Sequence, residues 1–579
     1  MSMNLLRVSA ARQSARIGRT LPQTTRRMAR SYATQHQQHQ PTSSTPWFLG
    51  SLIVFGPILF KLTSPPPKPK KKVVEEHHEP TTTTAAATPT PVEEAPKVQK
   101  PYVLIGAGTA SFAAAQAIKE KDPQANVIII GDEEYAPYMR PPLSKELWFS
   151  EDPEVAKKLV FKDWQGNERN TIYQDLAEYQ VIPDASGSDL QTSKIKLLFN
   201  KVAKLNIEDH TVTLADGSVI YYNKVLLATG GEPKNLPNQP KDVANVTTYR
   251  TVEDFKKLDK IAKNGAHIAV VGGGFLGSEL AVALAKRAEK ENLTVTQVFP
   301  EEGNMANVFP SYLTKWTTSR VRKLGVKVET NSAIQSIKSD DNKVVLNLGG
   351  DKQLAVDHVV VAVGIEPRVE LARAAGLEVD EKRAGVVVNA ELEARTDVFA
   401  AGDMVSFHDV QLGRRRIEHH DHAVLSGRHA GENMVGAAKP YTHQSMFWSD
   451  LGPEVGYEAV GLVDSQLSTL SVWAKATAKD TPAMGAASEA NSPRGAPNAA
   501  TTTTSNEAAK PAVAKDTFQD EKFGKGLVFY LRDKKIVGLL LFNVFGKVQE
   551  ARDIINAGYT SDQIDGLLKK FNLHEEDSH

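Results

Sequence analysis

Two glycine-rich turns, each between an apolar run and a helical pattern, constrain most strongly what this chain can fold into. The two turns read Gly106-Ala-Gly108-Thr-Ala-Ser111 and Gly272-Gly-Gly274-Phe-Leu-Gly277. In a strand, turn and helix of this kind, the first glycine permits the tight turn, and the second lets a pyrophosphate approach the helix N-terminus. One such fingerprint is a weak signal. Two in one chain predict two dinucleotide ligands, most simply a flavin and a nicotinamide dinucleotide.

Each turn is followed by a second apolar run and then by an acidic residue, where a ribose-binding carboxylate belongs. Asp132 follows the run 127–130, and Glu301 follows the run 294–299. Ser111 replaces the third glycine of the first turn, and its small hydroxyl still permits close helix packing. The sequence therefore predicts two β-α-β dinucleotide units.

Composition narrows the chemistry that these units can perform. The 579 residues and 63.2 kDa exceed what one hydrophobic core supports, so we expect two to four domains. The chain contains no cysteine, which excludes disulfides, thiolate metal sites and a redox-active dithiol. Its 69 basic and 69 acidic residues give no reason to expect nonspecific attraction to nucleic acid. Any redox chemistry therefore needs a cofactor.

The N-terminal part resembles a targeting and anchoring region. No acidic residue precedes Glu75, whereas arginines recur up to Arg30, so residues 1–33 are predicted to be a mitochondrial presequence. The alternative is a disordered basic arm. Residues 47–62 are expected to anchor the chain in a membrane, either by spanning it or by lying at its interface. The Pro- and Lys-rich residues 63–99 are expected to form a disordered tether.

Longer segments resemble a known family. The strands 225–231 and 359–364 and the segment Ala401-Gly402-Asp403 are similar to the two-dinucleotide flavoprotein disulfide reductase superfamily. The missing cysteines exclude its dithiol branch. Within the superfamily, the chain resembles the mitochondrial apoptosis-inducing factors from about residue 100 onward. The most specific matching segments are 137–147, 272–280, 414–422 and 443–452.

The resemblance implies an α/β fold with two Rossmann-like domains and a C-terminal α+β domain. We expect an FAD-binding domain over 100–229 and 366–445 and an NADH-binding domain over 230–365. Residues 446–579 would form the C-terminal dimer or partner domain, with a disordered insertion at 477–515 that is rich in Ala, Thr, Ser and Pro. Within this domain, 526–532 and 536–542 predict a β-hairpin and 547–556 a helix.

The resemblance also assigns roles to single residues. Gly106, Gly108 and Asp132 would hold the FAD pyrophosphate and adenosine ribose, with Ser111 on the same turn. The remaining flavin contacts would come from Arg140, Lys145, Arg250 and Asp403. Around the nicotinamide, the family pattern implies Phe275, Glu279, Glu418, His419 and Trp448, with Lys145, Glu279, Phe275 and His419 at the reacting centre. In isolation, Arg140 and Arg250 would be surface charges, Lys145 a helix-end cation, and Phe275 a buried aromatic.

Two clusters in the segment 414–422 carry alternative interpretations. Three of the four residues 419–422 are histidines, which invites a metal site, but adjacent side chains project in different directions and no further ligand is suitably spaced. We therefore expect no metal. The arginines 414–416 form either an anion patch or a solvated loop.

These observations predict an FAD-dependent NADH oxidoreductase that passes hydride from nicotinamide to flavin and then to an acceptor such as a quinone. The competing hypothesis is a redox sensor in which NADH drives homodimerisation and partner choice with little turnover. The family also implies roles in respiratory-chain maintenance and cell death, an intermembrane-space import oxidoreductase as partner, and DNA binding after release. The neutral net charge does not support DNA binding.

Two expectations are in doubt, one because of a sequence rule and one because of a departure from the family pattern. Lysines at 61, 68 and 70–72 follow the apolar segment, so the positive-inside rule would place the body in the matrix. The resemblance implies inner-membrane anchoring with the body in the intermembrane space and nuclear relocation on cell death, and we follow it.

In the expected dimer surface, Glu378 and Arg395 match the family, whereas Val387 stands where the family carries an arginine. The dimer should therefore be weaker but not abolished.

Overall fold

The computed structural model describes residues 99–573, except 164–165, 191, 238, 240–242, 341–342, 453–454, 476–479 and 481–522. The expected presequence, the segment 47–62, all of the tether but residue 99, and all of the insertion 477–515 but Asp480 lie outside these residues. Among the residues described, no helix is long and apolar enough to cross a membrane.

A mainly parallel sheet contains the first glycine turn. Its strands run in the order β22 (Glu393–Arg395), β23 (Val398–Ala400), β10 (Lys224–Leu227), β1 (Tyr102–Ile105), β2 (Val127–Gly131), β6 (Lys196–Phe199) and β5 (Gln180–Val181). Strand β1 pairs in parallel with β10 and β2, and both β1 and β2 are buried along their whole length. Burial on both faces explains why these strands are continuous apolar runs rather than alternating ones.

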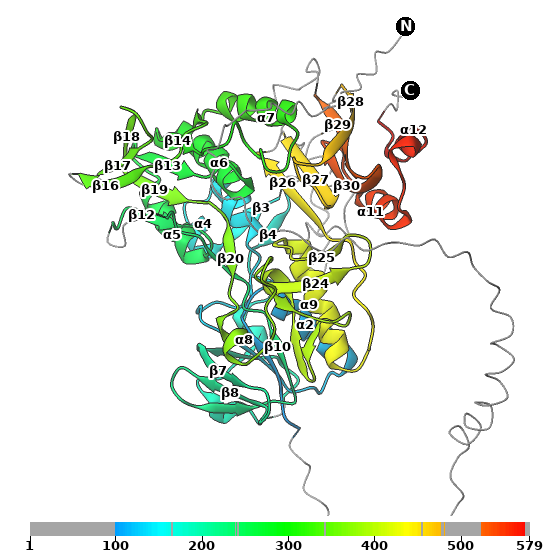
Figure 1. Ribbon diagram of the computed structural model, residues 1–579. Coiled ribbons are helices and arrows are strands. Elements are labelled where there is room, and N and C mark those ends of the chain that lie inside the picture. Colours follow the sequence, from blue (N-terminus) through cyan, green and yellow to red (C-terminus); the bar gives the residue numbers. More distant parts are fainter. Residues whose placement is uncertain are drawn as a thin grey trace, which may run out of the picture. The chain divides into compact units, whose positions relative to one another are not determined.

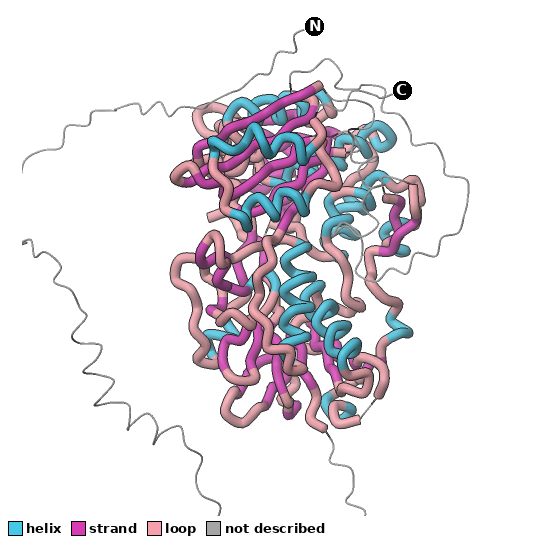
Figure 2. Tube along the Cα trace, turned by 90° about the vertical axis from the view of Figure 1, so that its right-hand side faces the viewer, coloured by secondary structure: helices cyan, strands magenta, loops and turns pink. Residues whose placement is uncertain are grey.

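A second parallel sheet contains the second glycine turn. Its order is β12 (Val246–Thr248), β19 (His358–Val361), β13 (His267–Val271), β14 (Thr294–Val298) and β15 (Lys327–Glu329). The helices of this part of the chain are α5 (Val252–Ile261), α6 (Phe275–Glu291) and α7 (Ser311–Lys323). In the side view of Figure 2, helices cover the strands, as expected for parallel sheets with helical crossovers. The predicted α/β fold with two dinucleotide units is confirmed.

The chain passes between the two parallel sheets through a pair of short strands. Strands β11 (Gly231–Pro233) and β20 (Ile365–Pro367) pair antiparallel, so the outgoing and returning segments lie side by side. We propose this pair as the boundary between the two dinucleotide-binding domains. Two antiparallel sheets flank these parts, β7 (Val202–Asn206), β8 (Thr211–Leu214) and β9 (Val219–Tyr221), and β16 (Ser336–Asp340), β17 (Lys343–Asn347) and β18 (Gln353–Val356).

The C-terminal part is built on an antiparallel sheet. Its order is β26 (Met446–Leu451), β27 (Val455–Gly461), β30 (Lys535–Phe542), β29 (Lys525–Arg532) and β28 (Ser468–Ala474). Helix α11 (Val548–Ala557) contacts β27 and β30, as Figure 1 shows. Asp533 and Lys534, the two residues between β29 and β30, both have positive φ. This is the geometry of a tight hairpin turn, and the predicted hairpin and helix are present.

The remaining elements are short. The helices are α3 (Glu146–Phe149), α4 (Val155–Lys158), α8 (Glu370–Ala374) and α12 (Ile564–Leu567), and the strands are β3 (Val160–Lys162), β4 (Glu168–Asn170), β21 (Val386–Val387), β24 (Val405–Asp409) and β25 (Gly413–Arg415). The 3-10 helix η1 (Pro141–Ser144) leads directly into α3.

Helices α2 (Thr109–Lys121) and α9 (His420–Met434) approach each other at glycines. A Cβ atom at Gly427 would lie 2.2 Å from the carbonyl oxygen of Ala110, and one at Gly431 would lie 2.4 Å from that of Ala114. The helix that follows the first turn is therefore held against α9 by backbone contact, which fixes the two helix N-termini relative to each other.

We predict that Gly427→Ala lowers the free energy of unfolding by about 1–3 kcal/mol, because the methyl group must force α2 and α9 apart. Gly566, in α12, is the matched control, since a Cβ there meets no atom within 4 Å. Gly566→Ala should be neutral or raise stability by up to about 1 kcal/mol. Urea unfolding of both variants measures the difference. Equal stability of Gly427→Ala and the wild type would show that the close approach is not rigid.

Candidate functional site

The first glycine turn presents an uncapped helix N-terminus to a cavity. Gly106 has φ +108°, and a Cβ there would lie 2.3 Å from the carbonyl oxygen of Ala228, so only glycine fits. A Cβ at Gly108 would meet no atom within 4 Å, and no side chain caps α2. Free backbone N–H groups at such an N-terminus favour an anion. These features fit the pyrophosphate of a dinucleotide.

A cavity of about 330 Å³ lies at this turn, within the size range of small-molecule sites. It brings together many residues predicted from sequence: Gly106, Gly108, Asp132, Arg140, Lys145, Arg250, Phe275, Glu279, Asp403, Glu418, His419 and Trp448. Five predicted residues do not line it: Ser111, Gly272, Gly274, Gly277 and Glu301. Ser111 is fully buried in α2, and its hydroxyl has no hydrogen-bond partner among the described residues.

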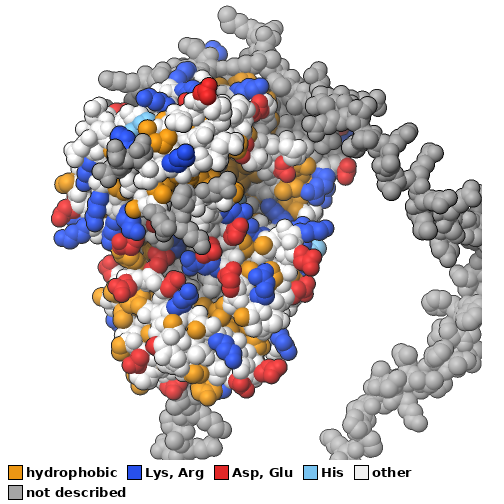
Figure 3. Space-filling view, turned by 60° about the vertical axis from the view of Figure 1, so that its left-hand side comes forward, with side chains coloured by type: hydrophobic (Ala, Val, Ile, Leu, Met, Phe, Trp, Pro, Cys, Tyr) orange, Lys and Arg blue, Asp and Glu red, His pale blue; other side chains and the backbone are white. Residues whose placement is uncertain are grey.

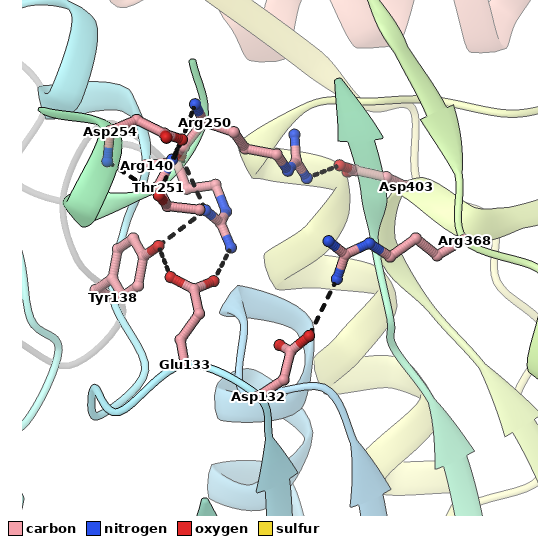
Figure 4. A network of polar contacts seen from close by, with 9 residues as sticks. All are labelled: Asp132, Glu133, Tyr138, Arg140, Arg250, Thr251, Asp254, Arg368 and Asp403. Carbon is pink, nitrogen blue, oxygen red and sulfur yellow. Dashed lines mark hydrogen bonds and ion pairs between the residues drawn. The ribbon is translucent and has the colours of Figure 1, made fainter. Parts of the chain in front are cut away.

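Two arginines are oriented on one side of the cavity by carboxylates (Figure 4). Arg140 forms an ion pair of 3.1 Å with Glu133 and donates a hydrogen bond of 2.9 Å to the carbonyl oxygen of Arg250. Arg250 in turn donates to Asp403 at 3.0 Å. Tyr138, whose pKa is raised by burial, donates to Glu133 at 2.6 Å. The network holds both guanidinium groups beside the cavity, where they can meet phosphate charge.

Asp132 lies at the end of β2, as predicted, and is half-exposed. Its Oδ2 lies 3.5 Å from Nη1 of Arg368, as Figure 4 shows. Nε of the same arginine lies 3.7 Å from Oε2 of Glu232. Gly131, just before it, must be small, since a Cβ would lie 2.4 Å from the Cβ of Ala107. The sequence did not single out Arg368, because the residue follows β20 and lies far along the chain from Asp132.

A buried ion pair crosses the cavity wall. Nζ of Lys145 lies 3.4 Å from Oε2 of Glu279, and both side chains are less than a tenth exposed. Two hydroxyls also donate to this carboxylate, Ser144 to Oε2 at 2.6 Å and Ser449 to Oε1 at 2.5 Å. Burial lowers the pKa of Lys145, but Glu279 and nearby acids outweigh it and raise that pKa above its usual value. Lys145 therefore stays charged, 5.9 Å from the ring centroid of Trp448.

The second wall of the cavity is formed by the start of α9 and by β26. His419 stacks on Phe447 with 4.6 Å between ring centroids, and burial lowers its pKa to about 4. His420 also lines the cavity, with its pKa likewise lowered by burial to about 4. Both rings are therefore neutral at pH 7. Glu418 pairs with Arg416 at 2.6 Å, and burial raises the pKa of Glu418.

The histidine run does not converge on one point. Asp421 accepts hydrogen bonds from His443 at 3.0 Å and from the backbone N–H of Met446 at 2.9 Å, whereas His422 stacks on Phe407. In the described part of the chain, no group of three or more His, Asp and Glu residues could hold a metal ion.

The second glycine turn has the geometry of the first but lies beyond the cavity lining. Gly272 has φ +128°, and a Cβ there would lie 2.2 Å from the carbonyl oxygen of Ala362. A Cβ at Gly277 would lie 2.3 Å from the carbonyl oxygen of Gly272, whereas Gly274 is open and α6 has no side-chain cap. Phe275 and Glu279, on the first turns of α6, reach into the cavity. Helix α6 thus connects the second glycine turn to the cavity of the first.

Sequence reasoning missed several cavity residues. Glu133, Ser144, Phe447, Ser449 and His420 contact the site or line it. Four of them lie inside or beside segments already singled out, 137–147, 414–422 and 443–452. Ser144 and Ser449 lie in these matching segments, but no charge, ring or glycine marked their small hydroxyls as site residues.

Comparisons with known proteins agree with this geometry. A family profile for pyridine nucleotide-disulphide oxidoreductases matches residues 100–427, and one for the C-terminal part of mitochondrion-associated apoptosis-inducing factor matches 430–557. A Drosophila melanogaster protein described as a mitochondrial apoptosis-inducing factor 1 is 43% identical over 84% of this chain and 67% of its own length. A mitochondrial apoptosis-inducing factor 1 from Dictyostelium discoideum is 38% identical over 83% of each chain.

A solved structure supports the fold independently. A ferredoxin reductase from Rhodopseudomonas palustris superposes with a TM-score of 0.61 at 23% identity, over 82% of this chain and all of its own length. At this identity the likeness concerns the fold alone.

We predict a pH-dependent effect at Glu146, next to Lys145. Burial raises the pKa of Glu146 to about 7 from its ordinary 4.5, and its Oε2 has no hydrogen-bond partner among the described residues. Between these pH values the folded chain binds more protons than the unfolded chain, so stability falls as pH rises. Glu146→Gln removes this titration.

Relative to the wild type, the Glu146→Gln variant should therefore gain stability from pH 5 to pH 8, by roughly 1–3 kcal/mol. Urea unfolding at both pH values measures the gain. A constant difference between the two proteins across this range would contradict the raised pKa.

Proposed function

Since the chain belongs to the apoptosis-inducing factor family, we propose that it serves respiratory-chain maintenance and cell death in mitochondria by passing hydride from NADH to its bound FAD. That the chain is an FAD-dependent NADH oxidoreductase follows from its family and from related ferredoxin reductases. The observation that carries the proposal is the buried Lys145–Glu279 pair, because it joins the cavity of the first turn to the helix of the second.

The first turn is the proposed FAD pyrophosphate site. Gly106 and Gly108 open the backbone N–H groups of α2, and Arg140 and Arg250 add positive charge beside them. Asp132 accepts from the adenosine ribose, and in doing so exchanges its contact with Arg368 for ribose hydroxyls. Asp403, held by Arg250, binds the ribityl chain.

When bound, flavin and nicotinamide supply the hydride acceptor and donor atoms. Lys145 holds positive charge at the cavity wall, and Glu279 with its two serine donors fixes the position of that ammonium group. Phe275 and Trp448 form apolar walls that exclude water and favour stacked rings. His419, neutral at pH 7, adds a packed surface without a competing charge.

The acceptor that reoxidises the enzyme is proposed to be a quinone. Relatives with 27–31% identity are named as ferredoxin reductase components, and one of 28% identity as a rubredoxin reductase, so electron delivery to a separate acceptor is common among similar chains. An import oxidoreductase of the intermembrane space is a further proposed partner.

The mitochondrial location is supported by the relatives, whereas the position within the mitochondrion is proposed. The homologues support a mitochondrial protein. Anchoring in the inner membrane by residues 47–62, with the body in the intermembrane space and relocation to the nucleus on cell death, remains a proposal. On the face drawn in Figure 3, basic and acidic side chains are interspersed, which does not favour DNA binding there.

The second candidate function, an NADH-dependent redox sensor, is favoured by one surface. Glu378 and Arg395 are exposed, and the backbone N–H of Val387 donates to the carbonyl oxygen of Glu378 at 2.9 Å. The backbone of Val387 is therefore held beside that of Glu378, and an arginine at position 387 would extend from the same surface. We propose that the surface formed by Glu378, Val387 and Arg395 is the dimer contact.

To test the enzyme proposal, the purified chain is mixed anaerobically with NADH or NADPH while flavin absorbance is followed. We expect bound, noncovalent FAD and reduction that is more efficient with NADH, because Glu301 would repel a 2′-phosphate. Glu301→Gln should narrow the preference by about tenfold or less. Protein that folds without binding FAD, or equal efficiency with both coenzymes, would contradict the proposal.

The dimer proposal predicts that NADH raises the mass measured by anaerobic light scattering. Val387→Arg should tighten the dimer by about twofold to fivefold, as expected for one exposed ion pair. Val219→Arg, on an exposed position of β9, is the control for added charge. An unchanged mass with fully reduced flavin at micromolar protein would rule the dimer out.

A further inference from the structure

A closed ring of three buried polar side chains lies behind the second glycine turn. Gln297 of β14, Ser278 of α6 and Asn304 are each fully buried. Nε2 of Gln297 donates to the Ser278 hydroxyl at 3.2 Å, Nδ2 of Asn304 donates to the same hydroxyl at 2.8 Å, and Nδ2 of Asn304 also donates to Oε1 of Gln297 at 2.9 Å. None of the three lines the cavity of the first turn.

Two hydrogens of this ring are donated to the backbone of the turn. Gln297 has a second amide hydrogen, which it donates to the carbonyl oxygen of Gly272 at 2.8 Å. Ser278 accepts two hydrogen bonds from the ring, so its own hydrogen is directed to the carbonyl oxygen of Gly273 at 3.4 Å. Both carbonyls are thereby held on the buried side of the turn. No side chain caps the N-terminus of α6 in the described part of the chain, so its first N–H groups can meet an anion.

The ring also fixes the loop that carries Glu301. Asn304 belongs to this loop, and the N–H of the next residue, Met305, donates to the carbonyl oxygen of Gly273 at 2.8 Å. The backbone N–H of Asn304 donates to the Thr318 hydroxyl at 2.8 Å, which anchors the loop from the other side. One set of contacts therefore sets the position of both the glycine turn and the loop with the predicted ribose-binding acid.

Stability alone does not account for this choice of residues. The Oδ1 atom of Asn304 is buried and has no hydrogen-bond partner among the described residues, which costs free energy. An apolar side chain of similar size would avoid that cost. The Asn304 amide instead donates to Ser278 and Gln297. It thereby orients the hydrogens that these two side chains donate to the turn.

We propose that Gln297, Ser278 and Asn304 are positioning residues for the adenosine-diphosphate half of NADH. They act through the Gly272–Gly274 backbone and the Glu301 loop without touching the ligand. The inference rests on the proposed function, since it concerns the coenzyme of that reaction.

The test uses the FAD-loaded full chain and two ring variants, Ser278→Ala and Asn304→Leu. The control is Thr247→Val, which removes a 2.9 Å hydrogen bond to buried His358 in the same sheet but away from the turn. The probes are ADP-ribose, titrated by calorimetry, and NADH and reduced nicotinamide mononucleotide, each used in anaerobic flavin reduction. The mononucleotide lacks the adenosine-phosphate half and so reports on the nicotinamide pocket alone.

We expect both ring variants to weaken ADP-ribose binding, and to raise the half-saturating NADH concentration, by about tenfold. The limiting rate of flavin reduction and the half-saturating concentration of the mononucleotide should change by no more than about twofold. Thr247→Val should leave all of these values at the wild-type level. If Asn304→Leu does not fold, Ser278→Ala, the smaller change, decides alone.

Wild-type binding of ADP-ribose by the ring variants overturns the positioning role. An equal loss in Thr247→Val also overturns it, because general loosening of the sheet would then explain the result. Failure of NADH to reduce the wild-type flavin would contradict the proposed function instead. ADP-ribose binding, measured by calorimetry, would still test the positioning role separately.

Discussion

The buried ion pair between Lys145 and Glu279 is the interaction on which the site depends. An ion pair at this depth loses much solvation, and it is stable only when the remaining hydrogen-bonding positions are also filled. Ser144 and Ser449 fill two of them. Lys145 follows η1, Glu279 lies on α6 and Ser449 lies on β26. The ion pair together with the Ser449 hydrogen bond therefore joins three separate parts of the fold. The C-terminal sheet is thereby connected directly to the cavity.

The backbone around the cavity was largely predictable because its constraints are local. Gly106 and Gly272 adopt positive φ and face a carbonyl oxygen at a distance that forbids a side chain, so the glycines had to recur after each apolar run. The runs themselves are continuous because parallel strands are buried on both faces. The predicted family is confirmed by the family profiles and the relatives, and the expected FAD and NADH cofactors are supported by the same matches.

The side-chain partners were less predictable because they depend on contacts between distant segments. Asp132 was singled out for its position after a strand, yet its contact with Arg368 exists only because β20 returns the chain beside the first sheet. Ser278 lies in the segment 272–280, but Gln297 and Asn304 belong to no motif. The ring of the three forms only when α6, β14 and the following loop are packed together. Expectations for the presequence, the anchor and nearly all of the insertion lie outside the described residues.

Electrostatics give the cavity two different walls. On one side, Arg140, Arg250 and Lys145 keep positive charge next to an uncapped helix N-terminus, which suits phosphate and an electron-rich ring. On the other side, burial keeps His419 and His420 neutral, so neither histidine adds charge beside the aromatic surfaces. We propose that the first wall holds the charged parts of the dinucleotide at the first turn, while the other favours stacked rings.

The most direct test is a double-mutant cycle on the limiting rate of flavin reduction by NADH, using Lys145→Met, Glu279→Gln and the double variant. If the pair acts as a unit, each single change should lower the rate by about tenfold or more, and the double variant should be no slower than the slower single variant. Wild-type rates in the singles with full FAD content, or losses that multiply in the double variant, would contradict the account.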